Sequence, residues 1–191
     1  MKKIVLIIPV LIAIFAFKPA DQSVWTLDKA HAKLGFTVTH LMVSDVEGWF
    51  KNFDAKIIST NDDFSDATIE MTAQVNSINT EEEQRDTHLK SADFLDAATY
   101  PTISFKSKTF KKVGTNMYKA IGNLTMHGVT KMVSLDAVGK IGVNPNSKKT
   151  IVGFKVTGTL KRSDFGIGTK FPDAMVSDEI AIVANAEFVK N

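Results

Sequence analysis

Side chains that could do chemistry gather in one short stretch, Gln84 to His88, which holds an arginine, an aspartate and a histidine. On a helix, Arg85 and His88 lie three positions apart and share a face, whereas Asp86 is turned away from Arg85 by about 100°. Three interpretations stay open: a solvated helix surface, a guanidinium and an imidazole that receive an anionic or carbonyl head group, or catalysis by His88 with a carboxylate.

Other sequence signals for catalysis or metal binding are missing. The four histidines, His31, His40, His88 and His127, form no HExxH pair or other recognised ligand spacing. The chain has no cysteine and no GxSxG motif, and Ser163 lacks the strand-to-helix elbow that activates a nucleophilic serine. The sequence therefore predicts no catalytic residue, no metal site, no required cofactor and no enzyme activity.

The N-terminal residues have the form of a secretory signal peptide. A basic start precedes an apolar run, Ile4 to Phe17, which Lys18-Pro19 ends. As a helix this run spans about 21 Å, less than the hydrocarbon core of a bilayer. We predict a signal peptide over residues 1–20, one domain over residues 21–191, a periplasmic or secreted location and no stable membrane insertion after cleavage.

The charge balance argues against nucleic-acid binding. The chain carries 23 basic and 21 acidic side chains, and losing Lys2 and Lys3 with the signal peptide removes the excess. A neutral domain without a basic stripe is poorly suited to neutralising phosphates. We therefore expect no nucleic-acid partner.

The elements that must position these side chains are mostly β-strands. Between Thr68 and Val75, apolar and polar residues alternate strictly, which is typical of a half-buried strand. The same period predicts eight or nine strands, and short links at residues 42–44, 61–65, 126–128 and 144–147 predict hairpins. Such a meander can form two stacked sheets or a closed barrel, and we favour the barrel because closure removes exposed edges. The expected strands cover residues 24–27, 34–40, 46–58, 68–75, 103–105, 120–126, 131–141, 152–160 and 180–188.

One segment interrupts the strands. Thr80 and Glu83 match a capping box, which predicts a helix from Thr80 to Lys90, and Ser91 is expected to cap a second short turn before Tyr100-Pro101. The stretch around Arg85 and His88 is therefore a helical insertion between two strands.

The interior of the barrel has two interpretations. Thirteen phenylalanines and seven methionines, some of them in the signal peptide, would suit a pocket for a flexible apolar chain. An eight-stranded barrel can equally be filled by its own side chains. The pattern alone does not separate a hollow lumen from a packed core.

Several short motifs occur in order from about Val24 to the C-terminus, and together they resemble the YceI-like, polyisoprenoid-binding family. Each string is weak by itself, but their combination is specific. The motifs are His31, FTVTHL at 36–41, VEGWF at 46–50, RDTHL at 85–89, DFLD at 93–96, YPTISF at 100–105, LTMHGVTK at 124–131, RSDFG at 162–166 and VSDE at 176–179.

The resemblance implies an all-β fold with a small helical insertion: an extended, lipocalin-like antiparallel β-barrel of about eight strands. It also implies export and a lumen that holds a polyisoprenoid pyrophosphate, an isoprenoid quinone or a fatty-acid amide. Lys161, Leu95 and Met132 depart from the family pattern, and of these Leu95 could alter the width of the lumen.

These expectations describe an exported carrier or binding protein whose partner is a long-chain amphiphilic lipid, and a homodimer is compatible with them. The alternatives are a lipid-modifying enzyme that uses His88 and nearby carboxylates, and a stress-related β domain that acts through its outer surface. The residues expected to line the lumen are Phe36, Val38, Phe50, Ile69, Met71, Phe94, Leu95, Ile103, Phe105, Leu124, Met126, Phe154, Val156 and Phe165. The residues expected at the polar rim are His31, His40, Arg85, His88, Ser163 and Asp164.

Overall fold

The computed structural model describes residues 21–191, so the predicted signal peptide over residues 1–20 lies outside the described residues. Almost all regular structure in this part is β-strand, with one α-helix, α1 (Glu83–Lys90), and two 3-10 turns, η1 (Val75–Ser77) and η2 (Arg162–Phe165). The strands are β1 (Ser23–His40), β2 (Ser44–Phe50), β3 (Phe53–Ser59), β4 (Thr68–Gln74), β5 (Ile78–Asn79), β6 (Thr102–Gly114), β7 (Met117–Met126), β8 (Val129–Val143), β9 (Thr150–Lys161) and β10 (Glu179–Lys190).

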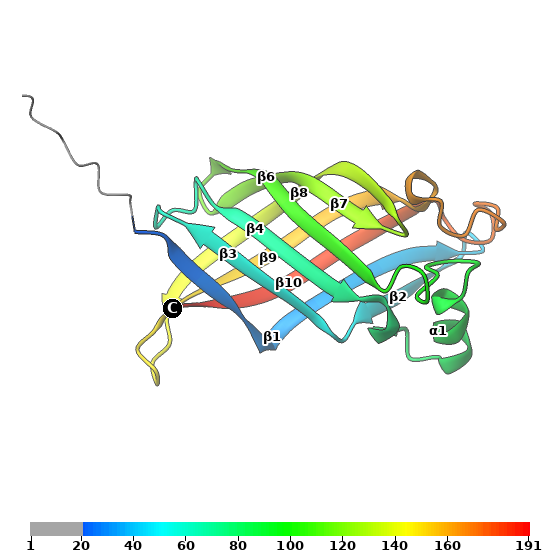
Figure 1. Ribbon diagram of the computed structural model, residues 1–191, viewed down its shortest axis with the longest axis horizontal. Helices are drawn as coiled ribbons and strands as arrows, with labels where there is room; N and C mark the ends of the chain where they lie inside the picture. The colour runs from blue at the N-terminus through cyan, green and yellow to red at the C-terminus, as the bar shows by residue number, and fades with distance from the viewer. Residues whose placement is uncertain (1–20) are drawn as a thin grey trace, which may run out of the picture.

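The strands form one closed antiparallel barrel (Figure 1). β1 pairs with β10 along both of its halves, which joins the two ends of the sheet, and this finding excludes two stacked open sheets. β2 and β3 pair with successive halves of β1 and act as one strand interrupted at Lys51-Asn52, and β4 and β5 are related in the same way. The described chain is therefore an eight-stranded barrel with one small helix, and the predicted fold is confirmed.

The predicted hairpin links are also confirmed. Residues 41–43 join β1 to β2, and His127-Gly128 joins β7 to β8. Both residues of the second link have positive φ, 51° for His127 and 73° for Gly128, as a two-residue hairpin turn requires. A Cβ on Gly128 would lie 2.6 Å from the Tyr100 ring. Glycine is therefore needed there for both conformation and space.

The predicted capping box at Thr80 and Glu83 is wrong. The helix begins at Glu83, and the carboxylate of the preceding Glu82 accepts from the amides of Gln84 (3.0 Å) and Arg85 (2.6 Å). The Thr80 amide and hydroxyl instead donate to the buried Asp86 carboxylate, at 2.8 and 2.6 Å. A buried carboxylate needs donors, and this requirement takes Thr80 away from the helix terminus.

One end of the barrel is plugged by aromatic side chains. Phe64, from the β3–β4 turn, is fully buried and packs on Trp25 and Phe154, with ring centroids 4.9 and 5.5 Å apart. Phe110 and Tyr118 stack at 4.9 Å beside them. We call this the closed end. The other end, the mouth, carries α1, the β1–β2 turn and residues 163–178, which we call the mouth loop (Figure 1).

Across residues 21–191, no helix has the length and apolar content needed to cross a bilayer.

Candidate functional site

Alternation along each long strand turns every second side chain into the barrel. β7 shows this most simply, because Tyr118, Ala120, Gly122, Leu124 and Met126 are all buried while the residues between them are more accessible. Inward side chains of neighbouring strands lie close together on one face of the sheet. The strands thus build an interior wall that is apolar over most of its length.

The interior is hollow between the aromatic plug and the mouth. An inner cavity of about 160 Å³ lies among the strands, and a second cavity of about 330 Å³ lies at the mouth. Five side chains line both cavities and form the boundary between them: Phe36, Phe50, Met126, Leu160 and Ile182. The barrel is therefore packed at its closed end and open at the other, so each earlier interpretation of the interior holds for one part of it.

Most of the side chains predicted to face the lumen line these cavities. The inner cavity has Ile69, Met71, Ile103, Phe105, Leu124, Phe154 and Val156 in its wall. The mouth cavity has Val38, Phe94 and Leu95. Phe36, Phe50 and Met126 lie at the boundary.

Phe165 is an exception, because it lines neither cavity. Its side chain is 1 % exposed and belongs to η2, just after β9 ends. The Phe165 carbonyl accepts a hydrogen bond from Nδ1 of His127 at 3.0 Å. Once the strand has ended, period-two alternation no longer decides which side chains face the lumen, so Phe165 is buried in packing around the turn.

Three of the predicted rim residues line the mouth cavity: His40 at the end of β1, and Arg85 and His88 on α1. The Arg85 guanidinium is held by Thr80, with its Nε donating to the hydroxyl and one Nη to the carbonyl, both at 2.8 Å. These bonds use two of the five N–H donors of an arginine. Arg85 is thus fixed in place with donors left over.

The His88 ring packs edge-on against two phenylalanine rings, which stack on each other with centroids 4.8 Å apart. Its centroid lies 5.0 Å from that of Phe94 and 5.5 Å from that of Phe171, and both contacts are edge-on. Its Nε2 lies 3.7 Å from a carboxylate oxygen of Asp93. A 2.6 Å hydrogen bond from Lys170, with His88 nearby, holds the pKa of Asp93 below its ordinary value. The carboxylate beside His88 is therefore that of Asp93, whereas the Asp86 carboxylate accepts from Thr80.

His31 does not lie at the rim. It occupies an exposed position at the bulge of β1, nine residues before His40, which is about 30 Å of extended strand. Its Nδ1 lies 2.9 Å from Asp28, and this hydrogen bond raises the pKa of His31. The prediction was wrong because the bulge keeps His31 on the outer surface, remote from the mouth.

Ser163 and Asp164 also lie outside the cavity wall. Both are exposed, and the Ser163 amide and hydroxyl each donate to the Asp178 carboxylate at 2.9 Å. The hydrogen bond from the Ser163 amide, together with that from its hydroxyl, lowers the pKa of Asp178. These residues close the base of the mouth loop, and their predicted place at the rim is wrong.

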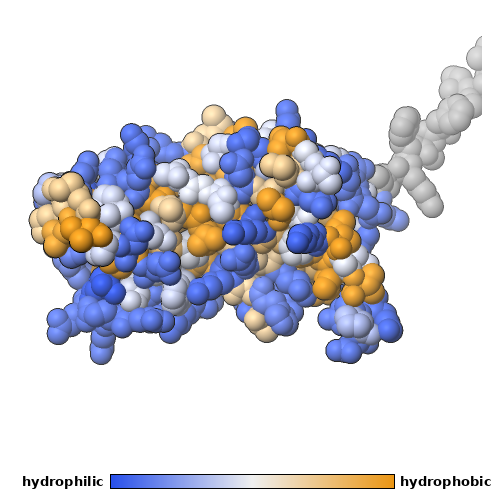
Figure 2. Space-filling model, turned by 180° about the vertical axis from the view of Figure 1, so that it is seen from behind, coloured by the Kyte–Doolittle hydropathy of each residue, from blue (hydrophilic) through white to orange (hydrophobic). Residues whose placement is uncertain are grey.

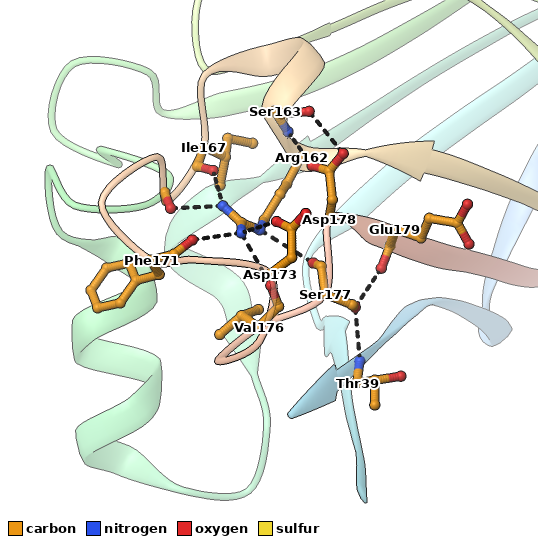
Figure 3. A network of polar contacts seen from close by, with 11 residues as sticks. Thr39, Arg162, Ser163, Ile167, Phe171, Asp173, Val176, Ser177, Asp178 and Glu179 are labelled. Atoms are coloured by element: carbon orange, nitrogen blue, oxygen red, sulfur yellow. Dashed lines mark hydrogen bonds and ion pairs between the residues drawn. The ribbon is translucent and has the colours of Figure 1, made fainter. Parts of the chain in front are cut away.

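Arg162 lines the mouth cavity, and sequence reasoning missed it. Its side chain is 4 % exposed, and its donors serve five backbone carbonyls and one carboxylate, that of Asp173 (Figure 3). The shortest contacts, both 2.7 Å, go to the carbonyls of Gly168 and Phe171. Since its acceptors belong to residues 167–177, Arg162 holds the mouth loop in shape. A signal existed: the inward period Val152, Phe154, Val156, Leu160 reaches Arg162 in one further step.

One group of potential metal ligands comes together within residues 21–191. Donor atoms of Asp28, His31 and Glu187 all lie within 4.8 Å of one another, on the outer surface beside the β1 bulge. Asp28 and Glu187 are directly opposite in the β1–β10 pairing. This group lies outside the two cavities, which together we call the tunnel. The tunnel has an apolar wall, with two arginines and two histidines at its mouth.

Comparison with known proteins agrees with this architecture. The model of the YceI-like domain matches residues 25–188. A UPF0312 protein of Staphylococcus aureus is 35% identical over 171 residues, which covers 86% of this chain and 96% of that protein. The crystal structure of a Campylobacter jejuni YceI protein is 36% identical, with a TM-score of 0.73, and the match covers 87% of this chain and 97% of that one.

A more distant structure shares the fold. It is a polyisoprenoid binding domain from Saccharophagus degradans, 13% identical, with a TM-score of 0.65 over 87% of this chain and 98% of that one. The extent of the family match, the identity to the relatives and the closed barrel lead to one conclusion: this chain belongs to the YceI-like family.

Proposed function

We propose that the chain is an exported carrier or binding protein that holds a long-chain amphiphile, such as a polyisoprenoid or an isoprenoid quinone, in the barrel. The observation that carries the proposal is the apolar tunnel, which is plugged at one end and opens at the other beside His40, Arg85 and His88. The polyisoprenoid binding domain of Saccharophagus degradans, which has the same fold, supports this ligand class.

The tunnel wall suits a hydrocarbon chain because nearly all of the side chains that line it are apolar. Burying apolar surface stabilises a complex by roughly 25 cal/mol per Å², so a chain that buries a few hundred Å² gains several kcal/mol before the costs of association. The five-residue boundary between the cavities is made of Phe, Leu, Ile and Met side chains. Affinity should therefore rise with chain length until the chain reaches the aromatic plug.

The mouth supplies the complementary polar contacts. Arg85 is pre-positioned by Thr80 and retains free donors, and His88 lies beside it on the same helix face. A guanidinium held in this way favours an anionic or carbonyl head group. The chain would thus provide most of the affinity, and the head would fix the orientation.

Blocking the tunnel tests the proposal. Ala184 lines the inner cavity from β10, whereas Val183, the preceding residue, faces outward. Ala184→Phe should fill the space and abolish uptake of a long-chain isoprenoid, while the matched Val183→Phe should leave uptake unchanged. Thermal unfolding with each variant would verify folding.

Native mass spectrometry of protein purified from its own source provides the direct measurement. We expect a bound long-chain lipid, and extraction would identify it. Finding neither a bound lipid nor lipid uptake would rule the carrier role out. Export is tested separately, by fractionating the cells and sequencing the mature N-terminus.

A further inference from the structure

The turn between β1 and β2 presents three large apolar side chains to solvent. Leu41, Met42 and Val43 are 51%, 75% and 86% exposed, and the last two values are the highest for any large apolar side chain among the described residues. Met175 of the mouth loop, 44% exposed, lies beside them because its carbonyl accepts from the Leu41 amide at 3.0 Å. We call these four residues the apolar tip. An apolar patch is visible at the left end of Figure 2, the end at which β1 and β2 meet.

Folding gives no reason for these residue types. Leu41 and Met42 adopt φ values of 51° and 58°, in the left-handed region that usually selects glycine, asparagine or aspartate. A polar turn would be better for both conformation and solubility. Strain of this kind, held at an exposed position, points to a function for the side chains themselves.

The apolar tip is continuous with the tunnel. His40, which precedes the tip, and Met175 within it both line the mouth cavity. His40 also forms a bridge with Val176, so the turn and the mouth loop are joined side by side. A hydrocarbon chain that leaves the mouth over this edge passes along apolar side chains.

The size of the tip favours a membrane over a protein partner. Four side chains cover far less than the roughly 800 Å² that each partner contributes to a stable protein complex. A bilayer surface requires only shallow insertion of apolar side chains. The Leu41 amide already donates to Met175 and the Val43 amide to the His40 carbonyl, at 3.0 and 3.1 Å. These donors are satisfied, so they do not oppose transfer of the turn into a less polar medium.

The residues beside the tip indicate which lipid charge the tip requires. The residues that flank the turn are His40 and Ser44-Asp45, which form no basic cluster. Lysine and arginine clusters are what direct a protein to anionic lipid. Insertion driven by the apolar side chains should therefore occur on zwitterionic lipid as well.

We propose that the apolar tip inserts into the surface of a lipid bilayer and places the tunnel mouth there, so that an apolar ligand enters and leaves without crossing water. Insertion of the tip into a bilayer does not depend on the proposed function. Ligand exchange at the bilayer rests on the proposed function, and insertion and exchange are measured separately.

Insertion is tested with vesicles of pure phosphatidylcholine and a chain that begins at Asp21, which contains every strand of the closed barrel. The apolar run before Asp21 would otherwise bind lipid itself. Met42→Asp/Val43→Asp should weaken co-sedimentation with the vesicles by about tenfold or more. The matched control is Val113→Asp/Met117→Asp, which changes two exposed apolar residues, 58% and 53% accessible, at the β6–β7 hairpin of the closed end. It should bind vesicles like the parent.

A tryptophan at the tip gives a second measurement of the same step. The emission of Met42→Trp should shift to the blue on adding the vesicles and be quenched by brominated acyl chains, as expected for a ring within the bilayer surface. Three results would each overturn insertion: the parent and the tip variant bind vesicles equally, the tip and control variants lose binding equally, or binding requires phosphatidylglycerol. A dimer in sedimentation that the tip substitutions dissolve would assign the tip to a second copy instead and also overturn it.

Exchange is tested with a fluorescent isoprenoid loaded into the barrel. For the parent, the transfer rate to vesicles should increase with vesicle concentration, and the tip variant should be about tenfold slower with unchanged binding of the probe in solution. A rate independent of vesicle concentration would overturn exchange at the membrane. If no isoprenoid binds at all, the proposed function fails, while the vesicle measurements still decide insertion.

Discussion

Arg162 offers the most demanding prediction, because one buried side chain holds the mouth loop together. Replacing it with methionine keeps most of the volume and removes the donors that serve the carbonyls of residues 167, 168, 171, 176 and 177. Since Arg162 is 4 % exposed, these contacts are largely shielded from water. The mouth loop should open, while the strands of the barrel stay paired.

The expected loss in the free energy of unfolding depends on which contacts of Arg162 stabilise the fold. The ion pair with Asp173 contributes little, since that carboxylate is 76% exposed and exposed pairs are worth about 0–1 kcal/mol. Hydrogen bonds to a charged group contribute roughly 1.5–3 kcal/mol each, but a surface loop can relax toward water, so the carbonyls are not additive. We expect a loss of about 3–5 kcal/mol, the range for breaking a buried charged network.

Urea unfolding measures this loss, and limited proteolysis locates it. We expect new cleavage within residues 163–178 and faster release of a bound lipid from Arg162→Met. Lys161→Met, on the adjacent exposed residue, is the matched control and should change stability by less than about 0.5 kcal/mol. Arg162→Lys should rescue little, because one ammonium cannot reach six acceptors. A loss below about 1 kcal/mol for Arg162→Met, or full rescue by lysine, would refute the reasoning.

Three further predictions concern other parts of the barrel. His88→Ala should leave uptake of a long-chain lipid nearly intact, as measured by fluorescent-probe binding. If the protein instead catalyses a reaction at the mouth, the parent should turn over the bound lipid and His88→Ala should abolish that turnover. Hydrogen bonds from Lys106 and Lys56 lower the pKa of Glu70 from 4.5 to about 2; the stability gained by this carboxylate is therefore present above pH 4.5 and lost as the pH falls toward 2, and Glu70→Gln should flatten that part of an acid-unfolding curve. Gly128→Ala should destabilise the barrel in thermal unfolding by at least about 1–2 kcal/mol, because φ is 73° there and the new Cβ would lie 2.6 Å from the Tyr100 ring. An unchanged midpoint would contradict the turn assignment.

The side chains that face the lumen could largely be predicted from the sequence, and those at the rim could not. Period-two alternation identifies the inward side chains of a strand wherever pairing persists, as it does at Met71, Phe105 and Leu124. At the rim the strands end, and turns and loops set the direction of each side chain. Ser163 was misplaced for this reason. His31 lies in the middle of β1 and was misplaced because a bulge keeps its side chain on the outer surface. Arg162 continues the inward period of β9, so alternation could have identified it.

The helix shows the same limit on a smaller scale. The position of a helical segment after β5 followed from local residue types, but its first residue did not. Thr80 has the right side chain to cap the helix, yet Asp86 lies buried six residues later and takes both its amide and its hydroxyl. The Thr80 amide could donate to the carboxylate of Glu83 or to that of Asp86. Burial of Asp86 decides between them, and burial is a property of the folded chain.

The sequence by itself determined the antiparallel strands, the helical insertion, the hairpin links and the apolar character of the inner face, because these follow from local periodicity and turn chemistry. Only the tertiary structure decided where the lumen is filled and where it is empty. Five aromatic side chains from distant segments meet at one end: Trp25, Phe64, Phe110, Tyr118 and Phe154. At the other end, Arg162 fixes the loop that borders the mouth cavity. Whether inward side chains meet across a barrel depends on strand pairing and register, which join residues far apart in the chain and leave no local pattern.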